Sequence, residues 1–465
     1  MTSNTATLRS STFHATFQRL VLGVAAIVLL SITAWTSRSL YFVWEEWGHL
    51  WDAVESPAWG LLQSHNGYVS PLGRLLFLVE AKVFGHWYTG YTLVNALLLI
   101  AVAALLWWIY RSSNPWSSWA LTGGLVTFMF SAGALFAVHF AAMNAYFLAW
   151  LFGLLALRFW LSGRSPWLVG GLLLAGGLSS TLMSLVVAAL VLPSMVALGR
   201  RGAPPRWSWS YLRGPVGYGF VVVVTSGSLY LLGRAFPSVD TSVGVDQAIS
   251  AEVLQDPFAQ LIPLGSLLAV WLLTPFIALT GLDQVAYERA VILFIDRPYL
   301  ILVVFAILVG LLATTMSPRL GGRGWRRDGW FILLLVAAVV FAIQVAFLRS
   351  NNAIEVRYTL FWLPSIIVFW STWIDVADAT RVRLIARLGT VLIVAAGVVA
   401  IASSPLFVDD SVDLIRPRTE LSMQLKDQVQ DCPAGSLSEV TQTLAPGMPW
   451  QAVCDSAGSS VRKTR

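Results

Sequence analysis

The ionisable residues that follow the first apolar run have the types and the spacing for acid–base chemistry at a membrane surface. Glu45 and Glu46 are adjacent carboxylates. In a helix, Glu45, His49 and Asp52 would fall at i, i+4 and i+7 and so share one face. A carboxylate beside a hydroxyl group can act as a general base, and ionisable groups held against a bilayer are costly enough to suggest a function. The alternative is the solvated polar face of an interfacial helix.

The same stretch predicts the helix that would carry these acids. Trp44, Trp47 and Trp51 recur at i, i+3 and i+7, next to Leu50 and Val54. Because tryptophan favours the headgroup level of a bilayer, this stripe indicates an amphipathic helix lying on the membrane surface.

The composition defines the class of protein around this helix. Of 465 residues, 57% are hydrophobic and only 12% are charged, and several apolar runs approach or exceed the roughly 20 residues that cross a bilayer. A soluble globular protein is thereby excluded. We predict an all-α polytopic transmembrane helix bundle with about 11–13 spans by the positive-inside rule. The net charge of +6 comes from Arg residues in short loops, so it does not indicate nucleic-acid binding. No nucleotide-binding or soluble-hydrolase motif is present.

The first span and the loop after it determine which side the acids occupy. Arg9 and Arg19 precede an apolar run and no small-residue cleavage site follows it, so we expect a retained span at about 17–35. It would deliver the first outer loop, 36–86, to the extracytoplasmic side. Residues 71–85 carry three charged side chains, and a second juxtamembrane helix explains them better than a buried span.

Charge and hydropathy also predict the remaining order. The expected spans are 87–110, 116–138, 144–161, a hairpin at 167–198 that bends at 179–181, 215–234, 330–348, 359–374 and 384–404. Between 258 and the Arg residues at 319–327 two interpretations stay open: a re-entrant segment at 259–282, or an extra passage at 285–294 beside the span at 299–316. Residues 1–404 would form the membrane domain and 405–465 an extracytoplasmic tail. There, a disulfide between Cys432 and Cys454 would add about 3 kcal/mol in an oxidising compartment.

With this topology the unusual polar side chains gather on the outer face. Besides the acids of the first loop they are His65, Asn66, Arg74, Lys82, His139, Asn144, Glu355, Arg357 and Tyr358. Arg offers a planar fork to phosphate and Lys a point charge, so such a cavity suits a substrate that combines hydroxyl groups with a phosphate. The alternatives are snorkelling of Arg74 and Lys82, a hydrogen-bonded helix-end role for His139, and interfacial anchoring by Arg357.

Four features in order along residues 20–375 resemble the GT-C-type membrane glycosyltransferases, especially the protein O-mannosyltransferase-like branch. The acidic pair Glu45–Glu46 opens the first outer loop, and YVSPLGRLLFLVEAKVFGHWYTGYTLVNALLLI resembles the stretch that follows that loop in the family. The segment ALFAVHFAAMNAYFLAW resembles the family's His-containing turn, and EVRYTLFWLPS resembles its Glu-Arg-Tyr signature. His139 matches the first His of the turn, and Asn95 matches the Asn of the preceding span.

The resemblance implies inverting transfer of a sugar from a polyprenyl-phosphate-linked donor to an acceptor hydroxyl on the outer face of the plasma membrane. One acid of the Glu45–Glu46 pair would deprotonate the acceptor, which could be a glycan, a lipid or a protein. Arg357, with Lys82 or Arg74, would stabilise the departing lipid phosphate. His65, Asn66, His139, Glu355 and Tyr358 are candidate substrate-binding residues. No cofactor is certain, and a divalent metal stays open.

The chain also departs from the family pattern. Asn144 stands where the family has Glu, Ser180 and Thr181 stand where a Lys-Glu pair is common, and the opening acids are Glu rather than Asp. Two other functions therefore stay in view: a non-catalytic GT-C-like scaffold of a cell-envelope complex, and a transporter of lipids or small molecules. Transporters often contain inverted repeats, which this sequence does not show.

Overall fold

The computed structural model describes residues 3–40, 42, 46, 61, 69–85, 87–198, 209–235, 284–316, 359–378 and 382–405, with single positions between 262 and 338. All regular elements in these residues are helices. In the described part of the chain, seven helices are long and apolar enough to cross a membrane, or up to nine if each of two bent pairs is one span. The predicted all-α polytopic bundle is confirmed to this extent. The C-terminal tail beyond residue 405 and the total number of crossings lie outside the described residues.

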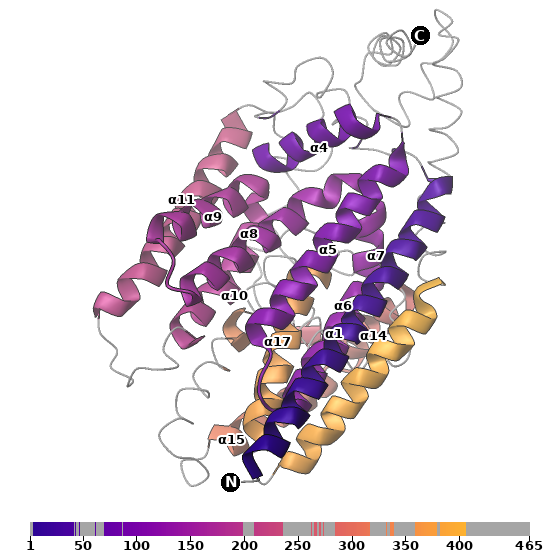
Figure 1. Cartoon of the computed structure of the whole chain (residues 1–465), viewed down its shortest axis with the longest axis vertical. Coiled ribbons are helices and arrows are strands. Elements are labelled where there is room, and N and C mark those ends of the chain that lie inside the picture. Colours follow the sequence, from indigo (N-terminus) through magenta and orange to yellow (C-terminus); the bar gives the residue numbers. More distant parts are fainter. Residues whose placement is uncertain are drawn as a thin grey trace, which may run out of the picture.

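The helices follow the order that hydropathy predicted (Figure 1). They are α1 (Ser3–Thr36), the 3-10 turn η1 (Ser37–Ser39), α4 (Pro71–Phe84), α5 (Tyr88–Tyr110), α6 (Pro115–Met129), α7 (Ala132–His139), the 3-10 turn η2 (Ala141–Met143), α8 (Asn144–Leu161), α9 (Pro166–Ser179), α10 (Thr181–Leu198), α11 (Trp209–Ala235), α14 (Gln284–Asp296), α15 (Tyr299–Met316), α17 (Thr359–Asp378) and a last helix at Arg383–Pro405. Local sequence features explain where several helices begin. The Asn114 side chain accepts a hydrogen bond from the Trp116 N–H at 3.0 Å, and Pro115 is the first residue of α6.

The span expected at 116–138 is not one continuous helix. It divides into α6 and α7, which are bent by 48°. Ser131 leaves the helical conformation (φ −66°, ψ 146°), and its hydroxyl oxygen accepts from the Ala134 N–H at 3.3 Å, so it caps α7. The two helices still pass the test for a span when taken together, and hydropathy did not reveal the break because it averages over the residues at which the serine cap bends the chain.

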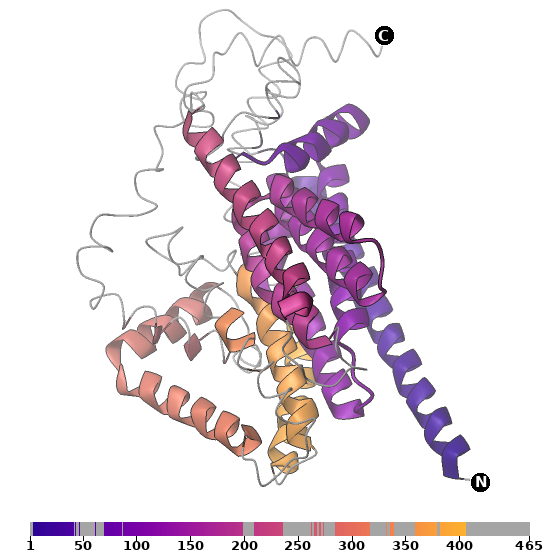
Figure 2. The same cartoon turned by 90° about the vertical axis from the view of Figure 1, so that its left-hand side faces the viewer.

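The helix expected at 71–85 is present as α4 (Pro71–Phe84), and its juxtamembrane position stays a prediction. It has 14 residues, is not among the candidate spans, and lies across one end of the bundle (Figure 1). Gly73 permits its close approach to α8, because a Cβ built there would lie 2.5 Å from the Ala145 Cβ. The segment 285–294 is helical within α14, and α14 and α15 meet at a sharp bend to one side of the bundle (Figure 2).

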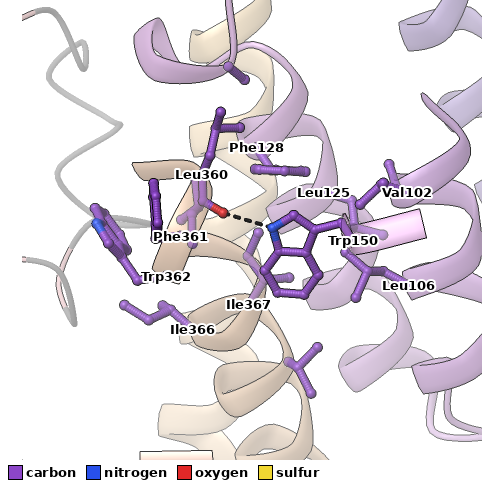
Figure 3. Packing of buried hydrophobic residues seen from close by; sticks show 14 of the residues in the cluster. Val102, Leu106, Leu125, Phe128, Trp150, Leu360, Phe361, Trp362, Ile366 and Ile367 are labelled. Atoms are coloured by element: carbon purple, nitrogen blue, oxygen red, sulfur yellow. Dashed lines mark hydrogen bonds between the residues drawn. The ribbon is translucent and has the colours of Figure 1, made fainter. Parts of the chain in front are cut away.

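The centre of the bundle is α17, whose span is 89% buried. It packs along α6 and touches α10 and α7. Trp150 of α8 is fully buried and donates its indole N–H to the Leu360 carbonyl at 3.2 Å (Figure 3). Leu125, Phe128 and Ile367 surround this contact (Figure 3). A buried tryptophan needs such a partner for its N–H, and the contact holds α8 against the first turn of α17.

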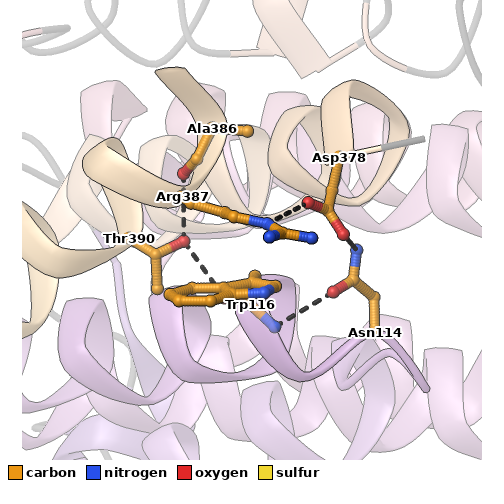
Figure 4. Close-up of polar contacts among 6 residues, drawn as sticks. All are labelled: Asn114, Trp116, Asp378, Ala386, Arg387 and Thr390. Atoms are coloured by element: carbon orange, nitrogen blue, oxygen red, sulfur yellow. Dashed lines mark hydrogen bonds and ion pairs between the residues drawn. The ribbon is translucent and has the colours of Figure 1, made fainter. Parts of the chain in front are cut away.

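Successive helices run in opposite directions, so the loops between them gather at two ends of the bundle. At one end, Asp378 accepts from Arg387 at 2.8 Å and from Asn114 at 3.5 Å, and Arg387 lies over the Trp116 ring (Figure 4). We call this the Asp378 end. The end of α1, the start of α5, the α7–η2 bend and the α9–α10 turn lie at the other end. We call it the Glu46 end after the residue that contacts both the start of α5 and the α7–η2 bend.

Candidate functional site

Glu46 is the best-defined of the predicted acids, and its carboxylate is fully buried. Its Oε1 and Oε2 lie 3.1 and 3.3 Å from the Tyr88 hydroxyl, and Oε1 also accepts from the Ala141 N–H. The Tyr88 hydroxyl donates to the His139 carbonyl oxygen at 2.7 Å as well. Glu46 therefore ties the first loop to the start of α5 and to the bend after α7.

That bend supplies the backbone groups which the side chains use. Phe140 is extended (φ −112°, ψ 105°), so the chain leaves the helix between His139 and Ala141. Freed backbone groups need partners when they are buried. The Ala141 N–H donates to Glu46, and the His139 carbonyl accepts from the Tyr88 hydroxyl. The Phe140 carbonyl accepts from the Asn95 amide at 2.9 Å. Three predicted residues, Glu46, His139 and Asn95, are thus brought together by one break in the helix.

Both ring nitrogens of His139 have partners within the protein. Nδ1 lies 2.7 Å from the Leu135 carbonyl oxygen, and Nε2 lies 2.6 Å from the Thr36 hydroxyl. Since a carbonyl only accepts, Nδ1 carries the hydrogen, and a neutral ring accepts from Thr36 at Nε2. The contact between Thr36 and His139 joins the end of α1 to α7. This is consistent with the alternative that His139 is a hydrogen-bonded residue at a helix end.

The charged residues of α4 divide between its two faces. Arg74 and Glu80 are buried, at 7% and 2% exposure, while Lys82 is exposed. The outward stripe of the helix is apolar and consists of Leu75, Val79 and Val83. A helix with polar groups inward and apolar groups outward suits contact with lipid, and inward charges in such helices mark functional sites. The structure therefore distinguishes Arg74, which is buried, from Lys82, which is exposed, although the sequence made both equal candidates for phosphate binding.

Glu80 is a site residue that sequence reasoning did not select. Its Oε2 accepts from the Asn144 amide at 3.2 Å, and its buried Oε1 has no hydrogen-bond partner among the described residues. Burial raises the pKa of Glu80 from 4.5 to about 8, and the bond from Asn144 opposes this in part. The helical spacing of the sequence could have identified Glu80, because Arg74, Phe77 and Glu80 fall on the face of α4 opposite its outward apolar stripe.

Most of the remaining predicted residues lie outside the described part of the chain. These are Glu45, His49, Asp52, His65, Asn66, Glu355, Arg357, Tyr358, Cys432 and Cys454. The first turn of α17 follows Tyr358 directly and contacts Trp150, six residues from Asn144 along α8. Ser180 and Thr181, at the turn after α9, are buried at 5% and 4% exposure. Within the described ranges, no three His, Cys, Asp or Glu side chains lie close enough to hold a metal ion.

Comparison with known proteins adds no relative. No protein-family model matches the chain, and neither curated proteins nor solved structures give a significant match. The fold and the site therefore define a class only: a helical polytopic membrane protein with two buried carboxyl groups beside one broken helix.

Proposed function

We propose that this protein is a GT-C-type membrane glycosyltransferase that transfers a sugar from a polyprenyl-phosphate-linked donor to an acceptor hydroxyl, with inversion. One observation carries the proposal: two buried carboxyl groups contact the same short bend, Glu46 at Ala141 and Glu80 at Asn144. Buried acids in membrane proteins are costly and concentrate at functional sites. The order of motifs in the sequence supplies the reaction class.

The basic residues support an extracytoplasmic position for the Glu46 end. Arg111 and Arg158 stack on Trp107 and Trp108 at the opposite end of α5, at 4.9 and 3.9 Å from the ring centroids. Arg387 lies at that end too. By the positive-inside rule, these residues support a cytoplasmic position for the Asp378 end. In the plasma membrane, the site would then open to the outside, where lipid-linked sugars would be the donors.

The contacts of Glu46 suggest different roles for the two residues of the acidic pair. A general base needs an oxygen near the hydroxyl that it deprotonates, whereas both Glu46 oxygens already contact Tyr88 and Oε1 also accepts from Ala141. We assign Glu46 to positioning the first loop and Glu45 to the base. Glu45 would take the acceptor proton as the acceptor oxygen bonds to the anomeric carbon. The bond from that carbon to the phosphate oxygen breaks, and Arg74 and Arg357 stabilise the departing lipid phosphate.

The test is transfer of radiolabelled sugar from a polyprenyl-phosphate-linked donor in membrane vesicles. Glu45→Gln should abolish transfer while the protein level stays unchanged, and Glu46→Gln should lower both transfer and thermal stability. Asp296→Asn removes an exposed carboxylate at the end of α14 and serves as the matched control. Full activity in both Glu45→Gln and Glu46→Gln would reject the assigned base and favour the non-catalytic scaffold.

A transporter is the second candidate, because the α6–α7 pair is a broken span. Discontinuous helices often form the substrate sites of secondary transporters, and α7 has the 48° break at its start and the bend at its end. The same vesicles separate the two functions. A transporter would move labelled lipid between leaflets without forming a glycosylated product, whereas a transferase would form product without net movement.

A further inference from the structure

The inner face of α4 is a fixed, polar surface at the Glu46 end. Arg74, Phe77 and Glu80 occupy it, and six residues of helix separate the two charged side chains by about 9 Å along the axis. Phe77 is 2% exposed and packs against Tyr91 with the ring centroids 5.3 Å apart. Because α4 also approaches α8 closely at Gly73, the positions of these side chains are set by packing.

Of the two carboxyl oxygens of Glu80, only one has a hydrogen-bond partner among the described residues. Asn144 donates to Oε2, and no described residue bonds to Oε1 or forms an ion pair with Glu80. Buried polar atoms in native proteins nearly always have a partner, so an exception needs an explanation. A carboxyl oxygen whose residue is only 2% exposed, and which no donor of the described residues reaches, is suited to a group that comes from a ligand.

The surroundings of Glu80 favour the protonated acid. Burial raises its pKa to about 8. The charged or titratable groups on the elements packed around it are Arg74 and Lys82 of α4, Tyr88, Tyr91 and Tyr110 of α5, Tyr146 and Arg158 of α8, and His139 and Glu46 beside η2, while α9 contains none. At pH 7 Glu80 is therefore mostly a neutral acid with one hydrogen to donate.

We propose that Glu80 donates the hydrogen of its free carboxyl oxygen to a phosphate oxygen of an anionic lipid ligand, on the same α4 face as Arg74. This rests on the proposed function, in which the donor lipid carries a phosphodiester. A carboxylate would repel the phosphate, but a neutral acid can approach it and form a strong O–H···O⁻ bond. Arg74 supplies the opposite charge that phosphate recognition needs.

The proposal couples ligand binding to a proton. The phosphodiester keeps a single negative charge at neutral and alkaline pH, so Glu80 is the group that would change its charge between pH 7 and 9. Once Glu80 loses its proton, the ligand loses a donor and meets a second negative charge. The affinity should therefore fall as pH rises through about 8, approaching a tenfold loss for each further pH unit.

Binding of farnesyl methyl phosphodiester to the purified full-length protein, measured by calorimetry from pH 6.5 to 9.5, tests this coupling. The wild type should bind more weakly above pH 8. Glu80→Gln is a neutral donor, so it should bind at all pH values and lose the pH dependence. Glu80→Leu should weaken binding at least tenfold at pH 7. Asp296→Asn, which removes an exposed charge at the end of α14, should leave the profile unchanged.

Three results would overturn the proposal. They are a wild-type affinity that does not change with pH, an unchanged pH profile in Glu80→Gln, and full binding by folded Glu80→Leu. Dimethyl phosphate, the same head group without a lipid chain, distinguishes the source of the ligand. If it binds as tightly as the lipid, the lipid part of the proposal fails. Since no sugar transfer is measured, binding that follows Glu80 in a protein without transferase activity would reject only the proposed function.

Discussion

Glu80 of α4 accepts a hydrogen bond from Asn144, the first residue of α8, at 3.2 Å. If the protein is the GT-C-type transferase that we propose, Asn144 stands at a position where the family has Glu. Here a carboxyl group reaches the same bend from a different helix, 64 residues earlier in the chain. The contact fastens α4 onto the bundle, and the carboxyl group keeps one oxygen without a partner in the described structure.

The stability of the protein should decrease as pH rises, and Glu80 should be a main cause. Its pKa is about 8 in the fold and 4.5 without burial. Between these values the folded protein retains a proton that the unfolded chain has released, so stability falls from about pH 4.5 to pH 8 and then levels off. Thermal unfolding in detergent should show a smaller decrease for Glu80→Gln than for the wild type. Equal slopes would mean that Glu80 is charged in the folded protein.

Tyr88 and Glu46 should be energetically coupled. Tyr88→Phe removes the hydroxyl that contacts Glu46 and the His139 carbonyl, which should cost about 1–3 kcal/mol. In a double-mutant cycle with Glu46→Gln, the interaction energy should be about 0.5–3 kcal/mol. Tyr91→Phe is the control, because the Tyr91 hydroxyl donates to the Gly85 carbonyl at 2.9 Å instead. Additive effects of Tyr88→Phe and Glu46→Gln on the unfolding free energy would contradict the coupling.

Gly73 should not tolerate a side chain. An added Cβ would lie 2.5 Å from the Ala145 Cβ and 3.1 Å from its Cα, so Gly73→Ala must push α4 away from α8. We expect a loss of about 1–3 kcal/mol in unfolding free energy, together with loss of the pH dependence that Glu80 causes. At Gly217 of α11 nothing lies within 4 Å of an added Cβ. Gly217→Ala should therefore be neutral or stabilise by up to about 1 kcal/mol. Similar stabilities for the two variants would show that α4 does not dock as described.

The two ends of the bundle should face opposite sides of the membrane. Trp87 is 56% exposed at the start of α5, and Ser162 is exposed at the end of α8. In a background with Cys432 and Cys454 replaced by Ser, Trp87→Cys should react with an impermeant maleimide on intact cells. Ser162→Cys should react only after permeabilisation. The reverse labelling would place the Glu46 end in the cytoplasm and reject the proposed outer-face site.

The sequence by itself determined the class of fold and most helix positions. A helix that crosses a bilayer needs about 20 apolar residues, and this requirement is local. It identifies α5 and α8 almost residue by residue, and prolines and caps mark the starts of α6 and α9. The sequence also predicted that the segment 71–85 does not cross the bilayer, because three charged side chains in one short segment are costly in lipid, and α4 is not among the candidate spans.

Only the tertiary structure decided which polar groups meet. The partners of Glu46 lie 42 and 95 residues away in the chain, and Asn144 lies 64 residues from Glu80. Hydropathy assigns each helix to the membrane but does not specify its rotation or its neighbours, which depend on packing such as that of Gly73 against Ala145. For the same reason the sequence identified Arg74 and Lys82 as similar cations, whereas the docking of α4 buries the first and exposes the second.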